Sequence, residues 1–165
     1  MELDIIQYDI DPETKRRLRM VLQNLLNKTS ANVIILTDDA GRIIDIKGQK
    51  EEDLETEFLA TLISGIFGAA VEMGKILRME DLEVLQYESK SMDVVIKYIR
   101  PRFLLGIIVG KGVALGTVRL FLKEAGEELE EVLEKAEMVP SKQIKIDIKE
   151  LEEKLSRVLG GPYEA

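Results

Sequence analysis

The chain contains no cysteine, no histidine and no tryptophan among its 165 residues. Without cysteine there is no disulfide, no thiolate nucleophile and no cysteine-type zinc site. The absence of histidine removes the commonest metal ligand and the usual general base near neutral pH. Most familiar catalytic constellations are therefore excluded, and we expect no catalytic residue, no metal site and no cofactor.

Basic side chains are also outnumbered, with 23 lysines and arginines against 31 acidic residues and a formal net charge of -8. This balance disfavours non-specific attraction to nucleic-acid phosphates and to anionic membranes. The first residues, MELDIIQYDID, lack the basic start and long apolar run of a secretory signal, and no later segment holds about 18 uninterrupted apolar residues. We therefore expect a cytoplasmic protein that neither binds nucleic acid nor inserts into a membrane.

What the chain does contain begins with a helix and a hairpin. A helix is predicted to begin at Pro12, because Asp11 can accept a hydrogen bond from an unpaired amide and proline has no amide to lose. Two β-branched runs at residues 33–37 and 42–47 flank the turn cluster 38–41, which indicates a β-hairpin. The two aspartates of this cluster have no third carboxylate at ligand spacing, so we interpret them as turn residues.

A long helix is predicted at residues 52–78, and it is apolar on more than one face. Gly65, Gly68 and Ala69 are among its small residues, and an interior glycine costs up to ~1 kcal/mol relative to alanine. Close approach of another helix would compensate. Because a domain of this size needs one face of the helix for its own sheet, we predict that the second face packs on a second copy of the chain. The alternative is a pair with the first helix inside one monomer.

Three antiparallel strands are predicted next, from LEVLQYES, SMDVVIKYI and RFLLGIIVG. The third is continuously apolar and should lie centrally in the sheet, whereas residues 82–88 should form an exposed edge that invites pairing with a second copy. A helix follows from Ala114 to about residue 137; we interpret its acidic second half as a solvated face, with a docking surface for a basic partner as the alternative. The remaining residues read as a strand-like arm and a short amphipathic helix, which either pack on the same chain or bind a partner.

The turn at Gly110, Lys111 and Gly112 follows an apolar strand and so invites comparison with phosphate-binding loops. A P-loop needs four residues between its glycines and a serine or threonine after the lysine. Here three residues separate Gly106 from Gly110, and glycine follows the lysine. The dinucleotide fingerprint also fails, because its third glycine spacing is one residue too long. We instead predict a strand-to-helix corner in which Gly110 and Gly112 permit a tight exit and Gly116 lets the helix pack closely.

The order helix, hairpin, long helix, three-stranded meander and helix, taken with DDAGRII at residues 38–44 and VALGTVRLFLKEA at residues 113–125, resembles the Roadblock family. That family includes dynein light chain roadblock and the bacterial MglB-like proteins. The resemblance covers roughly residues 12–137. It implies an α/β (α+β) Roadblock-like domain at residues 1–137, built on a central five-stranded antiparallel sheet, followed by a C-terminal extension at residues 138–165.

The resemblance also implies a homodimer, with the middle helices side by side and the edge strands joined. The expected interface comprises Ser64, Gly65, Gly68, Ala69, Glu72, Val84 and Gln86. The function implied is that of a non-catalytic regulator or scaffold of a Ras-like small GTPase, promoting or modulating its GTP hydrolysis. The alternatives are a structural adaptor subunit of a larger assembly and a small-ligand sensor, the latter disfavoured because the apolar residues offer few convergent polar groups.

Overall fold

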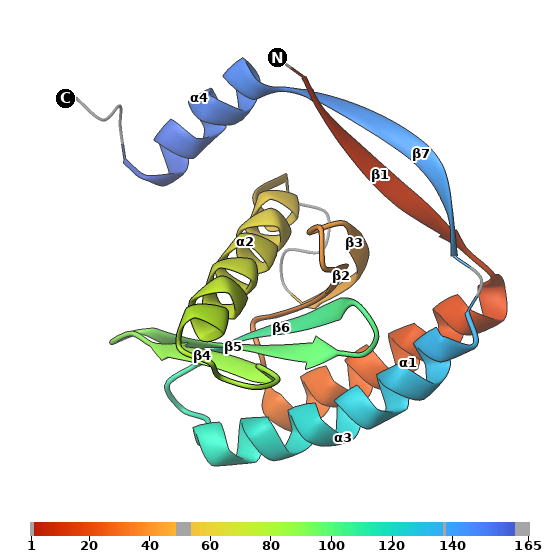
Figure 1. Ribbon diagram of the computed structural model, residues 1–165, viewed down its shortest axis with the longest axis vertical. Helices are drawn as coiled ribbons and strands as arrows, with labels where there is room; N and C mark the ends of the chain where they lie inside the picture. The colour runs from red at the N-terminus through yellow and green to blue at the C-terminus, as the bar shows by residue number, and fades with distance from the viewer. Residues whose placement is uncertain (1, 49–53, 137, 161–165) are drawn as a thin grey trace. The chain divides into compact units, whose positions relative to one another are not determined.

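The computed structural model describes residues 2–48, 54–136 and 138–160. Its helices and strands follow the predicted order between residues 10 and 136, and one strand precedes them (Figure 1). The elements are β1 (Glu2–Ile10), α1 (Pro12–Thr29), β2 (Val33–Asp38), β3 (Ile43–Gly48), α2 (Leu54–Ile76), β4 (Val84–Glu88), β5 (Met92–Ile99), β6 (Phe103–Gly110), α3 (Leu115–Glu134), β7 (Met138–Asp147) and α4 (Ile148–Val158).

The chain divides into two compact units. One contains α1, α2, α3 and the strands from β2 to β6. The other contains β7 and α4 together with β1, which pairs with β7 in a two-stranded sheet. The change of unit after α3 lies where the C-terminal extension was predicted to begin. The sequence-based division, however, placed the first nine residues in the Roadblock-like domain, whereas they group with the C-terminal segment.

The larger unit is built on a five-stranded antiparallel sheet in the order β3-β2-β6-β5-β4. The central position of β6 and the edge position of β4 confirm both predictions. β6 is apolar on both of its faces because both are covered: α2 lies on one face of the sheet, and α1 and α3 lie side by side on the other (Figure 1). Since α1 packs against α3, the alternative of a pair between the first helix and α2 is wrong.

The first helix begins as its sequence predicts. Asp11 accepts a hydrogen bond from the Thr14 amide at 3.0 Å, and Pro12 occupies the first turn. Ser30 ends the helix in the left-handed conformation, and its amide donates to the Leu26 carbonyl. The apolar stripe of this helix is buried against α3 and the sheet. Its buried hydrophobic residues are Leu18, Val21, Leu22 and Leu25.

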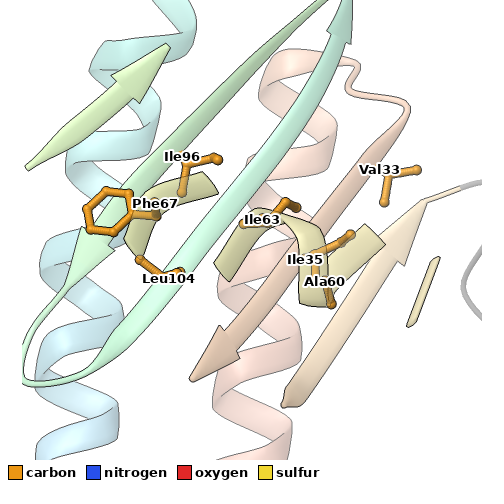
Figure 2. Packing of buried hydrophobic residues seen from close by; sticks show 7 residues of the cluster. All are labelled: Val33, Ile35, Ala60, Ile63, Phe67, Ile96 and Leu104. Carbon is orange, nitrogen blue, oxygen red and sulfur yellow. The ribbon is translucent and has the colours of Figure 1, made fainter. Parts of the chain in front are cut away.

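A second core lies between α2 and the other face of the sheet (Figure 2). Ala60, Ile63 and Phe67, which are spaced three and four residues apart, form the buried face of α2. They pack against strand residues from β2, β5 and β6 in a cluster completed by Val33, Ile35, Ile96 and Leu104. Burial of each large apolar side chain is worth about 1.5–3 kcal/mol, so this contact fixes which face of α2 points away from the sheet.

Two glycines let α2 come close to the rest of the domain. A Cβ atom at Gly106 of β6 would lie 2.9 Å from Ile63 Cδ1, and one at Gly41 would lie 3.0 Å from the Cα atom of Thr61. Gly41 also has a positive φ of 80°, which suits glycine in the hairpin turn. The Ser64 hydroxyl donates to the Asp39 carbonyl at 2.6 Å, so the turn and the middle of α2 are joined directly.

Candidate interaction surface

The outer face of α2 is apolar and open to solvent. Leu62, Ile66, Met73 and Ile76 are 45%, 41%, 59% and 83% exposed. Gly65 and Gly68 lie among them, and a Cβ atom at either position would meet no atom within 4 Å. Among the residues that the structure describes, no contact therefore compensates the helix-destabilising effect of these two glycines. A helix that carries a second apolar face beyond its core contacts is typical of an interaction surface.

Length and composition alone would also allow the segment Glu55–Ile76 to cross a membrane. The same composition is expected for a helix with one apolar face on a core and a second on a protein partner. The side chains of Ala60, Ile63 and Phe67 are already buried on the sheet, which a lipid-embedded helix would not require.

The edge strand β4 borders the same region. Within the described residues it pairs with β5 alone, so the backbone groups on its other side point away from the sheet. Leu85 pairs with Ile96 and belongs to the core on the α2 side, so the alternation of a strand places Val84 and Gln86 on the α3 side. Val84 is half-buried, and Gln86 is exposed.

The residues predicted for a dimer interface thus lie on two neighbouring elements, with differing exposure. Gly65, Gly68, Ala69 and Glu72 are exposed on the outer face of α2, where Glu72 pairs with Lys75 at 2.8 Å. Ser64 is half-buried and bonded to the hairpin turn. That these residues contact a second copy stays a prediction. The predicted set omitted the large exposed residues Leu62, Ile66, Met73 and Ile76, although their helical spacing marks the same face.

A groove of about 810 Å³ lies between the C-terminal half of α2 and β5, and the residues that lead into β4, Leu82 and Glu83, also line it. Phe67 and Tyr98 stack within its wall, with ring centroids 6.1 Å apart. Gly68 and Glu72 from the predicted interface also line it. The groove therefore extends from α2 to the segment that leads into the edge strand.

A second groove, of about 660 Å³, lies on the opposite face of the sheet between α3 and β4–β5. Val84, Val95 and Leu122 contribute apolar lining, and the rim carries basic side chains. These are Lys97, Arg100, Arg119 and Lys123. Glu83, Glu127 and Glu130 also line the groove, and Glu130 accepts a hydrogen bond from the Arg100 amide at 3.3 Å.

The turn between β6 and α3 gives no sign of a phosphate cradle. Lys111 forms an ion pair with Asp93, a carboxylate that is 3% exposed, so its ammonium group already has an anionic partner. The structural reason predicted for the glycines is wrong. Gly110, Gly112 and Gly116 have no positive φ, and a Cβ atom at any of them would meet nothing within 4 Å.

The two aspartates of the hairpin act as turn residues, as predicted. Asp38 Oδ1 accepts the amide of Ala40 at 3.0 Å and that of Arg42 at 2.8 Å. The same carboxylate lies 3.7 Å from the Arg42 guanidinium. Across the part of the chain that the structure describes, no three acidic side chains come together as a possible metal site.

Comparison with known proteins identifies a matching family and a relative of similar length. A model of the Roadblock/LC7 domain matches residues 17–109. An uncharacterized protein of Aquifex aeolicus is 32% identical over 161 residues, which cover 97% of this chain and 99% of that protein.

The fold is similar to that of several solved structures. The gliding protein MglB from Thermus thermophilus superposes with a TM-score of 0.70 at 24% identity, covering 76% of this chain and 94% of that chain. MglB of Myxococcus xanthus gives a TM-score of 0.68 at 26% identity, covering 72% and 95%. A Roadblock/LC7 domain from Streptomyces avermitilis gives 0.63 at 14% identity, covering 70% and 97%. The five-stranded sheet and its helices match the fold of these proteins.

Proposed function

Since the chain belongs to the Roadblock/LC7 family, we propose that it is a cytoplasmic, homodimeric regulator of a Ras-like small GTPase and contributes no catalytic residue of its own. The observation that carries this proposal is its similarity to MglB over most of the larger unit. MglB-like members of the family, as the sequence resemblance implies, regulate GTP hydrolysis by such a partner. The nucleotide would then be held by the GTPase.

The surface described above supports this role. Dimerisation through the outer faces of α2 and the free edges of β4 would bury exposed apolar residues such as Ile66 and Met73. It would also offer an explanation for Gly65 and Gly68, at which a Cβ atom would meet no described residue within 4 Å. An MglB protein that is 23% identical to this chain and shares its fold has been solved in a tetrameric arrangement.

The test is to mix the purified protein with each Ras-like GTPase of the source organism, loaded with GTP or GDP. We expect one GTPase to form a complex, measured by sedimentation, and to change its rate of phosphate release. Gly68→Glu should weaken both effects. Gly112→Glu is the matched control, because Gly112 is equally open but lies in the loop between β6 and α3. If no GTPase binds or changes its rate, the proposal is wrong.

A structural adaptor in a larger assembly is the second candidate, supported by the family match itself. Purification of the tagged protein from its own organism distinguishes the two. Stoichiometric recovery of assembly subunits without a GTPase would favour the adaptor.

A further inference from the structure

The groove between α3 and β4 is bordered by cations that lack an ionic partner among the described residues. Arg119 and Lys123 lie one helical turn apart on α3, are exposed, and form no ion pair there. Val84 lines the same groove from the edge strand. In a chain with a net charge of -8, two such cations beside an open strand edge favour an acidic group brought by whatever pairs with that edge.

The position of these cations along β4 follows from the packing of α3 on β5. A Cβ atom at Gly126 would lie 2.8 Å from Lys97 Cε, so this part of α3 lies directly against Lys97. Lys97 is the register partner of Val84. Lys123 precedes Gly126 by about one helical turn and therefore lies near the Val84 end of the edge strand.

The sequence of β4 suits one register of two-fold symmetric pairing with a second copy better than the neighbouring registers. β4 has five residues, so a two-fold antiparallel pairing that uses all of them is centred on Gln86. Val84 then faces Glu88 of the second copy on the α3 side, and Leu85 faces Tyr87 of the second copy on the α2 side. The first pairing brings a carboxylate to the groove, and the second forms an aliphatic–aromatic pair.

Two neighbouring registers also keep each side chain on its own face of the sheet, but they give less favourable pairs of side chains. A pairing centred on Leu85 places Glu83 opposite Tyr87, and a pairing centred on Tyr87 places Val84 opposite Lys90, which lies outside the strand. In both of them part of β4 stays unpaired and the aliphatic–aromatic contact is lost.

Joined edge strands are what the family resemblance implies; we propose that in this chain they pair in the register centred on Gln86, and that Glu88 of each copy enters the groove of the other beside Lys123 and Arg119. This inference rests on the homodimer of the proposed function and specifies the contacts on the α3 face of the joined sheet. The ion pairs of Lys123 and Arg119 in this groove then form only when a second copy supplies Glu88.

The register can be tested by cross-linking, because the chain has no cysteine of its own. Directly opposed residues of antiparallel strands have Cα atoms roughly 4.5–5.5 Å apart, within reach of a disulfide. Gln86→Cys should therefore form a covalent dimer on mild oxidation. Val84→Cys and Glu88→Cys should each fail alone and cross-link when mixed. Efficient cross-linking of Leu85→Cys instead, or of no position in a protein that is still a dimer, would overturn the inference.

The ionic contact is tested by charge reversal in the full chain, with the dimer dissociation constant measured by analytical ultracentrifugation at low and high salt. Glu88→Lys and Lys123→Glu should each weaken the dimer roughly tenfold at low salt, and their combination should restore most of the affinity. Glu128→Lys, an exposed change on α3 outside the groove, is the control. A dimer indifferent to both reversals overturns this inference alone, whereas a wild-type protein that stays monomeric overturns the proposed homodimer.

Discussion

Glycines at different positions in this fold differ in how closely other residues pack against them. Gly106 and Gly41 lie where α2 approaches the sheet and the hairpin turn: a Cβ atom at Gly106 would press on the end of the Ile63 side chain, and one at Gly41 would lie 3.0 Å from the Thr61 backbone. Gly65 and Gly68 lie on α2 itself, where a Cβ atom would meet none of the described residues within 4 Å. Sequence alone shows only that the helix is rich in small residues. The structure distinguishes the two kinds: some glycines allow close packing within the chain, and others lie on an exposed face where only a partner could pack against them.

Gly65→Ala tests that distinction. Alanine is favoured over glycine in a helix interior by up to ~1 kcal/mol, so the free energy of unfolding measured at low protein concentration should rise. If the outer face of α2 packs closely on a second copy, the same methyl group should weaken the dimer. Sedimentation at several concentrations measures the second effect. Raised stability with an unchanged dissociation constant would contradict close packing at this residue.

Gly68→Glu should produce monomers, because it places a charge on the predicted interface face of α2. Circular dichroism should show an unchanged fold, since no atom lies within 4 Å of the new Cβ position. Sedimentation velocity then reports the oligomeric state, with Gly112→Glu as control. A variant that remains fully dimeric would show that this face of α2 is not the interface.

At the scale of elements, local signals in the sequence predict the helix starts and turns that the structure contains. The first helix illustrates this, because hydrogen bonding to Thr14, first to its side chain and then to its amide, lowers the pKa of Asp11 below its ordinary value of 3.8. The ionised carboxylate is the better hydrogen-bond acceptor, and its negative charge is attracted to the positive end of the helix dipole.

Asp11→Ala should therefore lower the Tm at neutral pH. Because the folded-state pKa of Asp11 is depressed, its contribution is present above the unfolded value and is lost as pH falls through the folded value. The difference in Tm between wild type and variant should shrink below pH 3.8. Thermal unfolding from about pH 7 to about pH 2.5 measures this, and a constant difference would contradict the role of the charge.

Asp38→Ala should destabilise the hairpin between β2 and β3. The carboxylate is 2% exposed and holds two turn amides, and leaving such donors unsatisfied costs about 1–3 kcal/mol. Urea unfolding measures the change. Asp39→Ala is the neighbouring control, because Asp39 is exposed and its contact with Ser64 uses the main-chain carbonyl. Equal effects of the two variants would refute the assigned role.

The sequence predicted the order of elements well between residues 10 and 136, because caps, turn residues and apolar periodicity act over a few positions. It predicted the edge position of β4 for the same reason. β1 was missed, because its partner β7 lies at the other end of the chain and no local pattern reveals that pairing. The basic groove was missed as well, because Val84, Arg119 and Lys123 are brought together only by the packing of α3 on the sheet.

At the scale of the whole molecule, the division into two compact units predicts that the larger unit folds stably without the smaller one. A chain truncated after residue 136 keeps every strand of the five-stranded sheet and every helix that covers it. We expect it to unfold cooperatively with a Tm close to that of the full chain, measured by circular dichroism. A truncated chain without a cooperative transition would show that β7 and α4 are needed to hold the larger unit together.

The pairing of β1 with β7 also sets an order of events during synthesis. β1 is synthesised before the larger unit, whereas its partner strand β7 is made only after that unit. Closing so long a loop is entropically unfavourable in an unfolded chain. In the folded domain α1 and α3 lie side by side, so the start of α1 and the end of α3 come near each other (Figure 1). The small sheet should therefore form after the larger unit, and its presence would mark a chain in which β7 has been made and the larger unit has folded.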